Sequence, residues 1–395
     1  MHEAVIVDAV RTPGGKRNGK LKDWHPAALA AHVLKAVQER NHLDPVIVDD
    51  VIMGCVMQVG EQSLNIGRNA VLAAGWPESV PATTVDRQCG SSQQSMHFAA
   101  QGVMAGAYDV VIAGGVESMS HVPFGATTPV ASPHSPGILR RYPGGLIPQG
   151  ISAELVTAKF GFDRQTLDAF SAESHRRAAE ATEAGRFADQ IVPIEVTRPD
   201  GSTALHTVDE TIRPGTSARR LAELPSAFVD PAMTERFPQI GWNITAGNSS
   251  PFTDGASALL IMSEEKAVEL GLRPRARIHS FAVVGDDPIP MLTGPIPATR
   301  RVLERAGLTI DDLDAYEINE AFAPVPLAWA YDLDADLAKL NPWGGAIALG
   351  HPLGATGGRL MGTLLAYLEA TGGRWGLQAI CEAGGMANAT IIERL

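Results

Sequence analysis

The chain has 395 residues, of which 45% are hydrophobic, so it can bury at least two cores, and its length predicts two or three domains. The formal net charge of −12 argues against a general nucleic-acid binder or a protein that coats membranes, and an anionic ligand would need local basic residues. Three cysteines provide no disulfide framework, which fits a reducing setting. The start of the chain lacks the features of a signal peptide, and no apolar run approaches the roughly 18 residues of a membrane span. We therefore expect a soluble, cytoplasmic protein.

The first 120 residues alternate between short apolar runs, typical of strands, and segments with helical spacing of apolar residues. The expected strands cover 3–9, 48–55, 82–85 and 109–113, and the expected helices cover 26–40, 63–74 and 93–104. Pro26 suits the first turn of its helix, because that position needs no backbone N–H donor. This alternation predicts a parallel or mixed sheet with helices on its faces.

The pattern changes between about residues 121 and 150, where prolines interrupt a stretch with little periodicity. So long an irregular segment inside a compact protein is usually functional. Two helical patterns follow at 152–160 and 164–185, the second with Asp163 as its expected N-cap, and a mixed region comes after them. We interpret about 120–250 as an insertion that forms its own lobe.

The alternation of strands and helices returns after this insertion. The expected strands are 256–262, 276–284, 313–318, 378–382 and 387–393, and the expected helices are 297–307, 320–330 and 352–370. Each half contains a strand, a turn with a reactive residue and a helix, followed by a strand that ends in a pair of glycines. This correspondence suggests that the α/β fold is duplicated.

Cys89 lies at a predicted turn between the strand that ends at Val85 and the helix that starts near Gln93, and Gly90 leaves room beside the sulfur. Unpaired backbone N–H groups and the positive end of a helix dipole would favour the thiolate, which is the attacking form. The arrangement follows the logic of a nucleophile elbow with sulfur in place of the hydroxyl. The alternative is a small buried cysteine in front of a core helix.

His351 directly precedes a helix that begins with a proline, and glycines surround it on both sides. The helix dipole disfavours the imidazolium form, so we expect a neutral imidazole, as a general base requires. A nearby cysteine thiolate would act in the opposite direction and form an ion pair with it. The alternative role is that of a capping histidine. The spacing of the glycines does not fit a dinucleotide-binding fingerprint.

Two further residues follow predicted strands. Cys381 ends a buried strand beside Gly384 and Gly385, a position that suits proton transfer next to an oxyanion site, although core packing is the better interpretation of this feature alone. Asn319 is either the N-cap of the next helix or a side chain that positions a water or a substrate carbonyl. Cys55 is expected in the core, and no spacing of cysteines and histidines resembles a metal site.

Four blocks together resemble the thiolase family, in the family's order and at its spacing, and the resemblance covers essentially the whole chain. The blocks are 85–92, 319–323, 344–358 and 381–393. The resemblance implies two similar βαβαβαββ halves in a five-layered αβαβα fold with an inserted loop domain that binds coenzyme A. The implied domains are 1–120, completed by about 250–265, the loop domain 121–249, and 266–395. Residues 86–92 and 381–385 resemble in particular the actinobacterial thiolases of lipid and steroid breakdown.

The resemblance also implies a role for each reactive residue. Cys89 would be the nucleophile, His351 would activate it, and Cys381 would be the acid and base that moves the substrate proton. Asn319 would orient a water that forms one oxyanion hole with His351. The backbone N–H groups of Cys89 and Ala383 would form the other, and Ala383 stands where many relatives have glycine.

The implied contacts of coenzyme A are spread over the second half of the chain. Residues 245–250 resemble the loop of the family that meets the pantetheine arm, and the remaining contacts are one basic residue and two apolar ones. The expected contacts are Ala246, Ser250, Arg213 near the nucleotide, and Met291 and Phe322 in the pocket lining. The alternatives are a solvated charge for Arg213 and core positions for Met291 and Phe322. Coenzyme A would be a co-substrate, and no bound metal or permanent cofactor is expected.

The implied function is thiolytic cleavage of a 3-ketoacyl-CoA to acetyl-CoA and a shortened acyl-CoA, a reversible Claisen condensation, through an acyl-Cys89 intermediate in fatty-acid or steroid degradation. Alternatives are a biosynthetic acetoacetyl-CoA thiolase, a condensing enzyme of the ketoacyl-synthase type and a lipid carrier without activity. Pro148-Gln149 replaces the His-Met of many short-chain members, which weakens the acetoacetyl-CoA alternative. The expected partners are acyl-CoA and CoA, without nucleic acid or membrane, and the chain is expected to form a homodimer or homotetramer.

Overall fold

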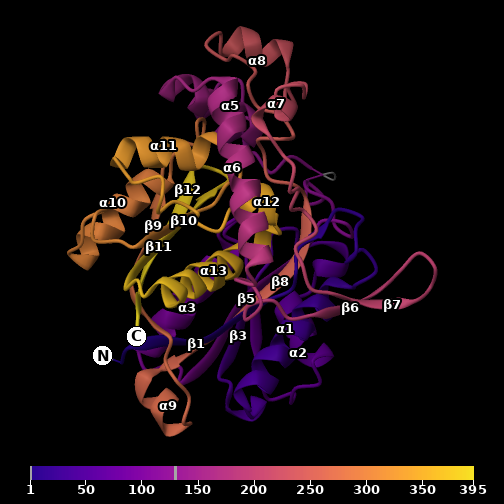
Figure 1. Ribbon diagram of the computed structural model, residues 1–395, viewed down its shortest axis with the longest axis vertical. Coiled ribbons are helices and arrows are strands. Elements are labelled where there is room, and N and C mark those ends of the chain that lie inside the picture. Colours follow the sequence, from indigo (N-terminus) through magenta and orange to yellow (C-terminus); the bar gives the residue numbers. More distant parts are fainter. Residues whose placement is uncertain (1, 129–130) are drawn as a thin grey trace.

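The computed structural model describes residues 2–128 and 131–395, and these residues form one mixed sheet of ten strands with helices on both sides (Figure 1). Residues 129–130 of the proline-rich stretch lie outside the described residues. The strands are β1 (Ala4–Arg11), β2 (Gly15–Lys16), β3 (Asp50–Gly54), β4 (Ala82–Val85), β5 (Val110–Ser118), β8 (Thr253–Ser263), β9 (Ala276–Gly285), β10 (Ala315–Ile318), β11 (Trp375–Glu382) and β12 (Met386–Arg394). Their order is β10-β11-β12-β9-β1-β8-β5-β3-β4, and β2 pairs with β8.

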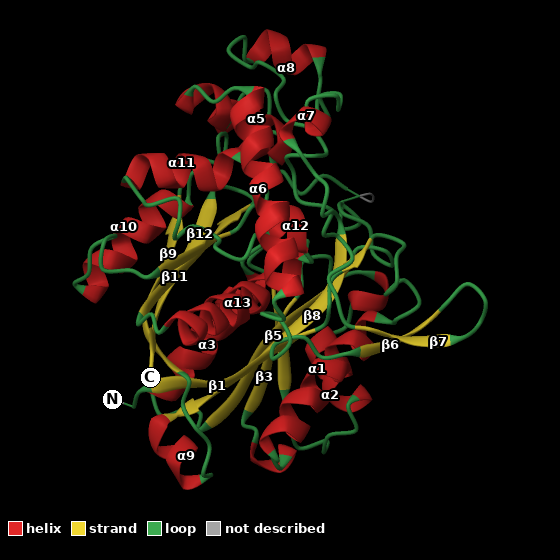
Figure 2. Ribbon diagram, in the orientation of Figure 1, coloured by secondary structure: helices red, strands yellow, loops and turns green. Residues whose placement is uncertain are grey.

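The N-terminal strands and the C-terminal strands of this sheet form two layers, and helices form three more. Together they make the expected five αβαβα layers (Figure 2). The layer-forming helices are α1 (Pro26–Asn41), α2 (Ile66–Ala73), α3 (Ser91–Met104), α10 (Pro295–Ala306), α11 (Pro324–Leu333) and α13 (Thr356–Thr371). The helices α3 and α13 contact each other in the central layer, α1 and α2 cover the N-terminal strands from outside, and α10 covers the C-terminal strands. The N-terminal and C-terminal strands join where β1 pairs with β9, over only two residues of each strand.

The expected duplication is visible in the order of the strands. The N-terminal half runs β1-β8-β5-β3-β4, and the C-terminal half runs β9-β12-β11-β10 in the matching direction. At the position that corresponds to β4, Leu340 forms only an isolated parallel bridge with Tyr316. In both halves the parallel pairing of the inner strands brings their carboxyl ends to one edge of the sheet, where ligands of α/β proteins usually bind.

Small residues allow the central helices to approach the sheet closely. A Cβ atom on Gly357 would lie 2.3 Å from the backbone nitrogen of Gln93, so α13 and the start of α3 touch through backbone. A Cβ atom on Gly115 would lie 1.9 Å from the carbonyl oxygen of Gly354, so the end of β5 meets the segment that follows His351 in the same way. These contacts fix the position of the two turns that carry Cys89 and His351.

The insertion forms a lobe at one end of the molecule, together with a projecting hairpin (Figure 1). Its elements are α4 (Pro136–Arg141), α5 (Gln149–Phe160), α6 (Arg164–Glu183), β6 (Ile194–Thr197), β7 (Thr203–His206), α7 (Ala218–Leu221) and α8 (Pro231–Arg236), and α9 (Glu264–Glu269) and α12 (Ala346–Leu349) lie in the rest of the chain. The predicted N-cap of α6 is confirmed, because Asp163 accepts from the Thr166 N–H at 2.8 Å. The limits predicted for the three domains stay a prediction.

The structure differs from the sequence predictions most clearly at the start of two helices and in the proline-rich stretch. The helix expected at 320–330 begins only at Pro324, so Asn319 is not its N-cap. The helix expected from Pro352 begins at Thr356, because a 3-10 turn (Leu353–Ala355) intervenes. The short helix α4 was not expected, since it lies in a stretch without helical periodicity.

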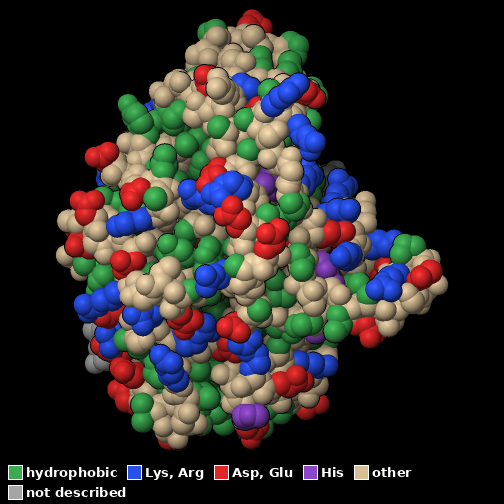
Figure 3. Space-filling model, viewed as in Figure 1, with side chains coloured by type: hydrophobic (Ala, Val, Ile, Leu, Met, Phe, Trp, Pro, Cys, Tyr) green, Lys and Arg blue, Asp and Glu red, His purple; other side chains and the backbone are tan. Residues whose placement is uncertain are grey.

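Acidic and basic side chains alternate over the face shown in Figure 3, with no large area of one sign. Among the described residues, no helix is both long enough and apolar enough to span a membrane.

Candidate active site

Cys89 lies at the turn between β4 and α3, as the sequence predicts, and it is only 4% exposed. Gln88 adopts a positive φ of 49°, which turns the chain sharply in front of the cysteine. A Cβ atom on Gly90 would lie 1.9 Å from Glu382 Oε1, so the missing side chain makes room for a carboxyl group. Apolar side chains, among them Leu353 and Ile380, enclose the thiol.

The predicted thiolate at Cys89 is not the resting form. Burial raises the pKa of this thiol to about 12, and the nearby charges of Glu382 and Glu117 act in the same direction. The expected N–H donors are not free, because the N–H of Gly90 bonds to the Arg87 carbonyl and the N–H of Ser91 to the Gln88 carbonyl. Desolvation therefore outweighs the helix dipole, and the sulfur must lose its proton to a base before it can attack.

His351 is buried and neutral. Burial, with a smaller contribution from the charge of Arg359, lowers its pKa to about 3, so the helix dipole given above is not the main cause. Its Nδ1 lies 2.6 Å from Thr356 Oγ1, and that hydroxyl donates its proton to the Pro352 carbonyl at 2.9 Å. The hydroxyl can thus only accept from Nδ1–H, which leaves Nε2 unprotonated. Since Cys89 is also neutral, the expected resting ion pair is absent between these two described residues.

Asn319 and His351 lie together. The Asn319 backbone N–H bonds to the Ala379 carbonyl at 3.0 Å, and its side-chain Nδ2 is 3.4 Å from His351 Nε2. Its Oδ1 is buried and has no hydrogen-bond partner among the described residues. A buried amide oxygen in this state can accept a hydrogen bond from a water, which matches the role that the family resemblance implies.

Cys381 lies fully buried on β11, paired with Ala387 of β12. Burial raises the pKa of its thiol well above the ordinary value, and the next causes are the charges of Cys89 and Glu382. The two sulfurs therefore lie near enough for the charge of one to act on the other. Cys381 also shares an apolar cluster with Met291 and Phe322, against which Ala383 packs.

The remaining predicted contacts of coenzyme A lie in two places. Ser250 is half-buried, and its N–H bonds to the Ala321 carbonyl at 3.0 Å, while Ala246 of the same loop is exposed. Arg213 is exposed on the insertion, and its backbone N–H bonds to His175 Nδ1 at 3.2 Å. Ser250 thus lies beside the segment that carries Asn319, whereas no hydrogen bond or ion pair joins Arg213 to the four reactive residues within the described chain.

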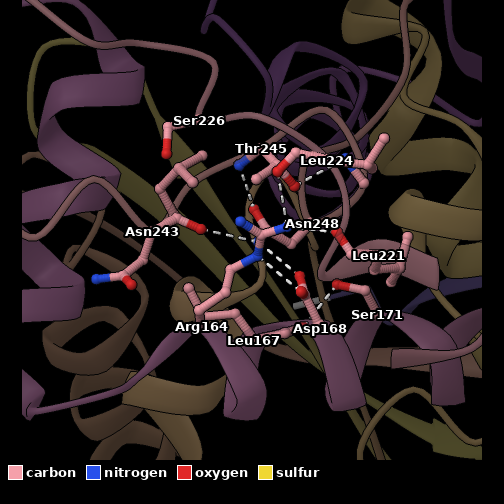
Figure 4. A network of polar contacts seen from close by, with 12 residues as sticks. Arg164, Leu167, Asp168, Ser171, Leu221, Leu224, Ser226, Asn243, Thr245 and Asn248 are labelled. Atoms are coloured by element: carbon pink, nitrogen blue, oxygen red, sulfur yellow. Dashed lines mark hydrogen bonds and ion pairs between the residues drawn. The ribbon is translucent and has the colours of Figure 1, made fainter. Parts of the chain in front are cut away.

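A buried polar network holds the loop of residues 243–250 in place (Figure 4). Asp168 of α6 accepts from Arg164 Nε at 2.7 Å and from Asn248 Nδ2 at 3.0 Å. Asn248 in turn binds the Thr245 N–H at 2.8 Å through its side chain and the Ala323 N–H at 2.9 Å through its carbonyl. The network therefore connects α6, this loop and the residues that follow Asn319.

Sequence reasoning missed four residues beside the site: Glu117, Gln149, Thr356 and Glu382. Glu117 binds the Gly354 N–H at 2.9 Å and so ties β5 to the segment after His351. Thr356 orients the imidazole, and Gln149 and Glu382 lie near the Cys89 sulfur. Their positions depend on segments far apart in the chain. The sequence offered a signal at Glu382, next to Cys381, and at Gln149, which stands where many short-chain members have methionine.

A cavity of about 250 Å³ lies elsewhere, between α6 and α11. Phe170, Leu327 and the buried Glu320 line it, and neither cysteine of the site does. Glu320 is fully engaged, since it accepts from Ser174 Oγ at 2.7 Å and Asn341 Nδ2 at 2.9 Å. We therefore do not assign this cavity to the reaction.

A duplicated five-layered fold with a buried cysteine at a strand-to-helix turn is that of an acyl-transferring enzyme. The family models described as the thiolase N-terminal domain and the thiolase C-terminal domain match residues 4–265 and 272–394. The chain belongs to the thiolase family, and the predicted fold class and acyltransferase activity are confirmed.

Curated relatives match over the whole chain. The protein is 48% identical over 405 residues to a steroid 3-ketoacyl-CoA thiolase, FadA6 of Mycobacterium tuberculosis, covering 100% of this chain and 95% of the relative. It is 44% identical to a 3-ketoacyl-CoA thiolase of Aliivibrio fischeri, with 100% of both chains covered. The crystal structure of a Bacillus anthracis acetyl-CoA acetyltransferase matches with a TM-score of 0.89 and 37% identity, covering 100% of this chain and 99% of that one.

Proposed function

We propose that the protein cleaves 3-ketoacyl-CoA with coenzyme A, giving acetyl-CoA and a shortened acyl-CoA. The observation that carries this proposal is the nearness of two buried thiols, Cys89 and Cys381. Their chain neighbours Gly90 and Glu382 lie against each other, and burial and the charge of Cys89 raise the pKa of Cys381. The neutral imidazole of His351, whose unprotonated Nε2 lies 3.4 Å from Asn319 Nδ2, supplies the base that a thiol with a raised pKa requires. Relatives named 3-ketoacyl-CoA thiolase support the choice of substrate.

In the first half-reaction, His351 Nε2 takes the proton of Cys89, and the thiolate attacks the 3-keto carbon. The bond between carbons 2 and 3 breaks, and its electron pair passes to the departing acetyl-CoA enolate. The side chain of His351, together with a water on Asn319, stabilises the enolate oxygen, and Cys381 gives a proton to carbon 2. The acyl group stays on Cys89 as a thioester.

In the second half-reaction, the acyl group passes to coenzyme A. The Cys381 thiolate takes the proton of the coenzyme A thiol, whose sulfur attacks the thioester carbonyl. Cys89 leaves as a thiolate and recovers its proton from Nε2 of His351. The backbone N–H groups of Cys89 and Ala383 stabilise the oxyanion. Each half-reaction needs a second group near Cys89 that donates or accepts a proton, and Cys381 has this role in both. This requirement explains why the site contains two thiols.

Coenzyme A would lie along the loop that contains Ala246 and Ser250, with Arg213 toward its phosphates and Met291 and Phe322 beside the pantetheine arm or acyl chain. The apolar cluster shared by Cys381, Met291 and Phe322 supports this placement of coenzyme A. Exposed Arg213 supplies a positive charge for an anionic ligand on a chain whose net charge is −12.

We propose that the acyl chain is long or derived from a steroid, and that the protein works in fatty-acid or steroid degradation in the cytoplasm. The identity of 48% to the steroid thiolase supports this choice. A biosynthetic acetoacetyl-CoA thiolase is the second candidate, favoured by the likeness to an acetyl-CoA acetyltransferase. By family resemblance, we propose a homodimer or homotetramer, which light scattering after gel filtration would test.

A panel of 3-ketoacyl-CoA substrates, from acetoacetyl-CoA to polycyclic side chains, tests the activity through loss of the enolate absorbance. We expect thiolysis in the wild type, none in Cys89→Ala, and a mass increase at Cys89 after exposure to acyl-CoA. Cys55→Ala is the matched control, since Cys55 is also a buried free thiol but lies in another apolar cluster. Absence of thiolysis across the panel, or equal loss in Cys55→Ala, would contradict the proposal.

A further inference from the structure

One buried arginine has no partner for its guanidinium group. Arg359 lies on α13 and is only 3% exposed, yet none of its three side-chain nitrogens forms a hydrogen bond with any described residue. Its neighbour Arg11 shows the usual arrangement, because its guanidinium donates to both carboxylate oxygens of Asp209, at 2.6 and 2.8 Å. Burying a guanidinium costs free energy unless an anion or several acceptors surround it. Arg359 is therefore a candidate to bind an acceptor from outside the chain.

Arg359 lines a small cavity of about 10 Å³, next to the turn that follows His351. Arg11, Arg359 and Thr12 are its polar side chains, and the rest of the lining is small or apolar, including Leu349, Pro352 and Ala355. A volume of this order is close to the minimum that holds one water-sized occupant. The cavity thus admits one atom-sized ligand and excludes sulfate, phosphate and organic acids.

A glycine keeps this cavity open, and a hydroxyl group lies beside it. A Cβ atom on Gly255 would lie 3.2 Å from Pro352 Cγ and 3.4 Å from Thr12 Oγ1, so a side chain here would occupy the space between them. Thr12 Oγ1 accepts from the Ala256 N–H at 3.1 Å, and no hydrogen bond to a described residue uses its proton. The cavity is therefore lined by two groups with donors to spare, the Thr12 hydroxyl and the Arg359 guanidinium.

The charges around the cavity favour an anion. No acidic residue is among the described residues that line it. Asp209 is already bound by Arg11, and Glu320 is fully engaged, as described above. Burial raises the pKa of Glu317 to about 8, so this carboxyl is largely protonated near neutral pH. Burial lowers the pKa of Arg359 only to about 10, so its guanidinium keeps a charge that no described carboxylate pairs with.

We propose that this cavity binds one monatomic anion, with chloride as the physiological candidate, through the N–H groups of Arg359 and the hydroxyl of Thr12. A water is the other atom-sized occupant, but it carries no charge and has only two lone pairs for the five N–H donors of a guanidinium. A halide accepts several donors at once and neutralises the cation. The anion would join α13 to the turn of Pro352 and Ala355, and so hold the segment that follows His351 in place.

Crystals of the full chain grown in sodium bromide test the site directly, because bromide replaces chloride and is located by its anomalous scattering. We expect one anomalous peak within hydrogen-bonding distance of Arg359 and Thr12 Oγ1. Density at this place without an anomalous signal would identify a water and overturn the proposal. A direct contact between Arg359 and the Glu317 carboxyl, with no peak in the cavity, would also overturn it.

The melting temperature tests whether the anion binds in solution. A ligand that binds only the folded chain raises the melting temperature as its concentration increases. Between about 1 and 100 mM chloride, with sodium gluconate keeping the ionic strength constant, we expect the wild type to gain about 2 °C. An equal melting temperature at both concentrations would mean that a bromide peak marks an adventitious ion only, and the proposal would fail.

Variants assign the chloride effect to the two residues. Arg359→Met removes the donors and the charge, and should abolish the dependence of the melting temperature on chloride. Arg301→Met, at an exposed position of α10, is the control and should keep that dependence. Thr12→Val leaves the guanidinium in place and should raise the half-saturating chloride concentration about tenfold, whereas Thr12→Ser should resemble the wild type.

The threonine variants keep the proposal testable if Arg359→Met does not fold. A chloride dependence that both Arg359→Met and Thr12→Val leave unchanged would place the anion elsewhere and overturn this site. None of these measurements requires thiolysis, so the result is independent of the proposed function.

Discussion

At the scale of single residues, the proposed mechanism requires a neutral imidazole to take a proton from a neutral thiol. Burial raises the pKa of Cys89 to about 12 and lowers the pKa of His351 to about 3, so both groups are uncharged near neutral pH. The thiolate and imidazolium would form together, because each stabilises the other in a site of low dielectric constant. The raised pKa of Cys89 keeps the thiolate scarce near neutral pH, which lowers the reactivity of this sulfur toward alkylating agents and oxidants.

The orientation of His351 depends on the hydroxyl of Thr356, which accepts from Nδ1–H. In Thr356→Val this acceptor is lost, Nε2 is free to carry the proton instead, and we expect kcat to fall roughly 100-fold, less than when a charged partner is removed. Thr356→Ser keeps the hydroxyl and should remain within about threefold of the wild type. Thiolysis rates with equal melting temperatures check this expectation, and equal rates in the valine and serine variants would show that the hydroxyl does not set the tautomer.

The sequence predicted the position of Cys89 but not its charge. A strand followed by a glycine and a helix locates the turn, and the local pattern is enough for that. The charge depends on Leu353, Ile380 and Glu382, which come from the other half of the chain and bury the sulfur. The dipole of the following helix predicts a thiolate at Cys89. Residues that are distant in the sequence bury the sulfur, however, and this desolvation raises the thiol pKa and keeps the proton on the sulfur.

At the scale of elements, the loop of residues 243–250 is held by α6. Arg164 donates to Asp168 at 2.7 Å and to the Leu224 carbonyl at 3.1 Å, and Asp168 is fully buried. The chain after Asn319 is attached to the same loop through an isolated bridge between Ser249 and Phe322. A change in this network would therefore reach both the loop and the catalytic segment.

Removing Arg164 leaves Asp168 buried with Asn248 as its remaining side-chain donor. In Arg164→Met we expect a loss of about 3 kcal/mol of unfolding free energy, because a buried carboxylate loses its ionic partner. We expect KM for coenzyme A to rise about tenfold, since the loop is no longer held in place. Urea denaturation and steady-state kinetics measure the two effects.

The control for this prediction lies on the same helix. Arg176 is exposed and pairs only with Glu173 and Glu180 within the described residues, so Arg176→Met should change stability by less than about 1 kcal/mol and leave KM unchanged. A similar KM in Arg164→Met and Arg176→Met would contradict a role of the network in holding the loop.

Element boundaries were predictable where the chain carries its own signals. Asp163 caps α6 because its carboxylate reaches the third following N–H, and the sequence shows this pattern. The start of α11 at Pro324 was missed, because the chain after Asn319 is held in a turn by the Asn248 carbonyl and the bridge to Ser249. Tertiary contacts outweighed helical periodicity there.

At the scale of the whole molecule, the two halves share one interior. His97 lies on α3 of the N-terminal half, and its Nε2 lies 2.7 Å from Thr390 Oγ1 on β12 of the C-terminal half. Its ring stacks on Phe281 of β9 with 4.8 Å between the ring centres. Gln93 of the same helix also donates to Thr390, at 2.7 Å. His97 therefore joins the two halves, which only the folded arrangement shows.

This position makes stability depend on pH through His97. Burial lowers its pKa to about 3 in the folded protein, whereas the unfolded value is about 6.5. Below pH 6.5 the unfolded chain therefore binds a proton at this residue that the folded chain does not, and the wild type loses stability as the pH falls. Buried carboxyl groups with raised pKa values, such as Glu117 and Glu154, oppose this trend, so a comparison between variants is needed to isolate it.

The comparison uses His97→Gln, which removes the titrating group and destabilises the protein at pH 7 through lost packing on Phe281. Because the wild type alone loses the histidine contribution, the difference in unfolding free energy between the two proteins should shrink by about 1.4 kcal/mol per pH unit below 6.5, or about 2 kcal/mol by pH 5. Urea denaturation at pH 7, 6 and 5 measures it. Gln93→Met, which loses a neutral bond to the same Thr390, should keep a constant difference from the wild type. If the difference in unfolding free energy between His97→Gln and the wild type also stays constant, His97 must bind its proton in the folded protein. The contact of His97 with Thr390 and Phe281 would then be open to water.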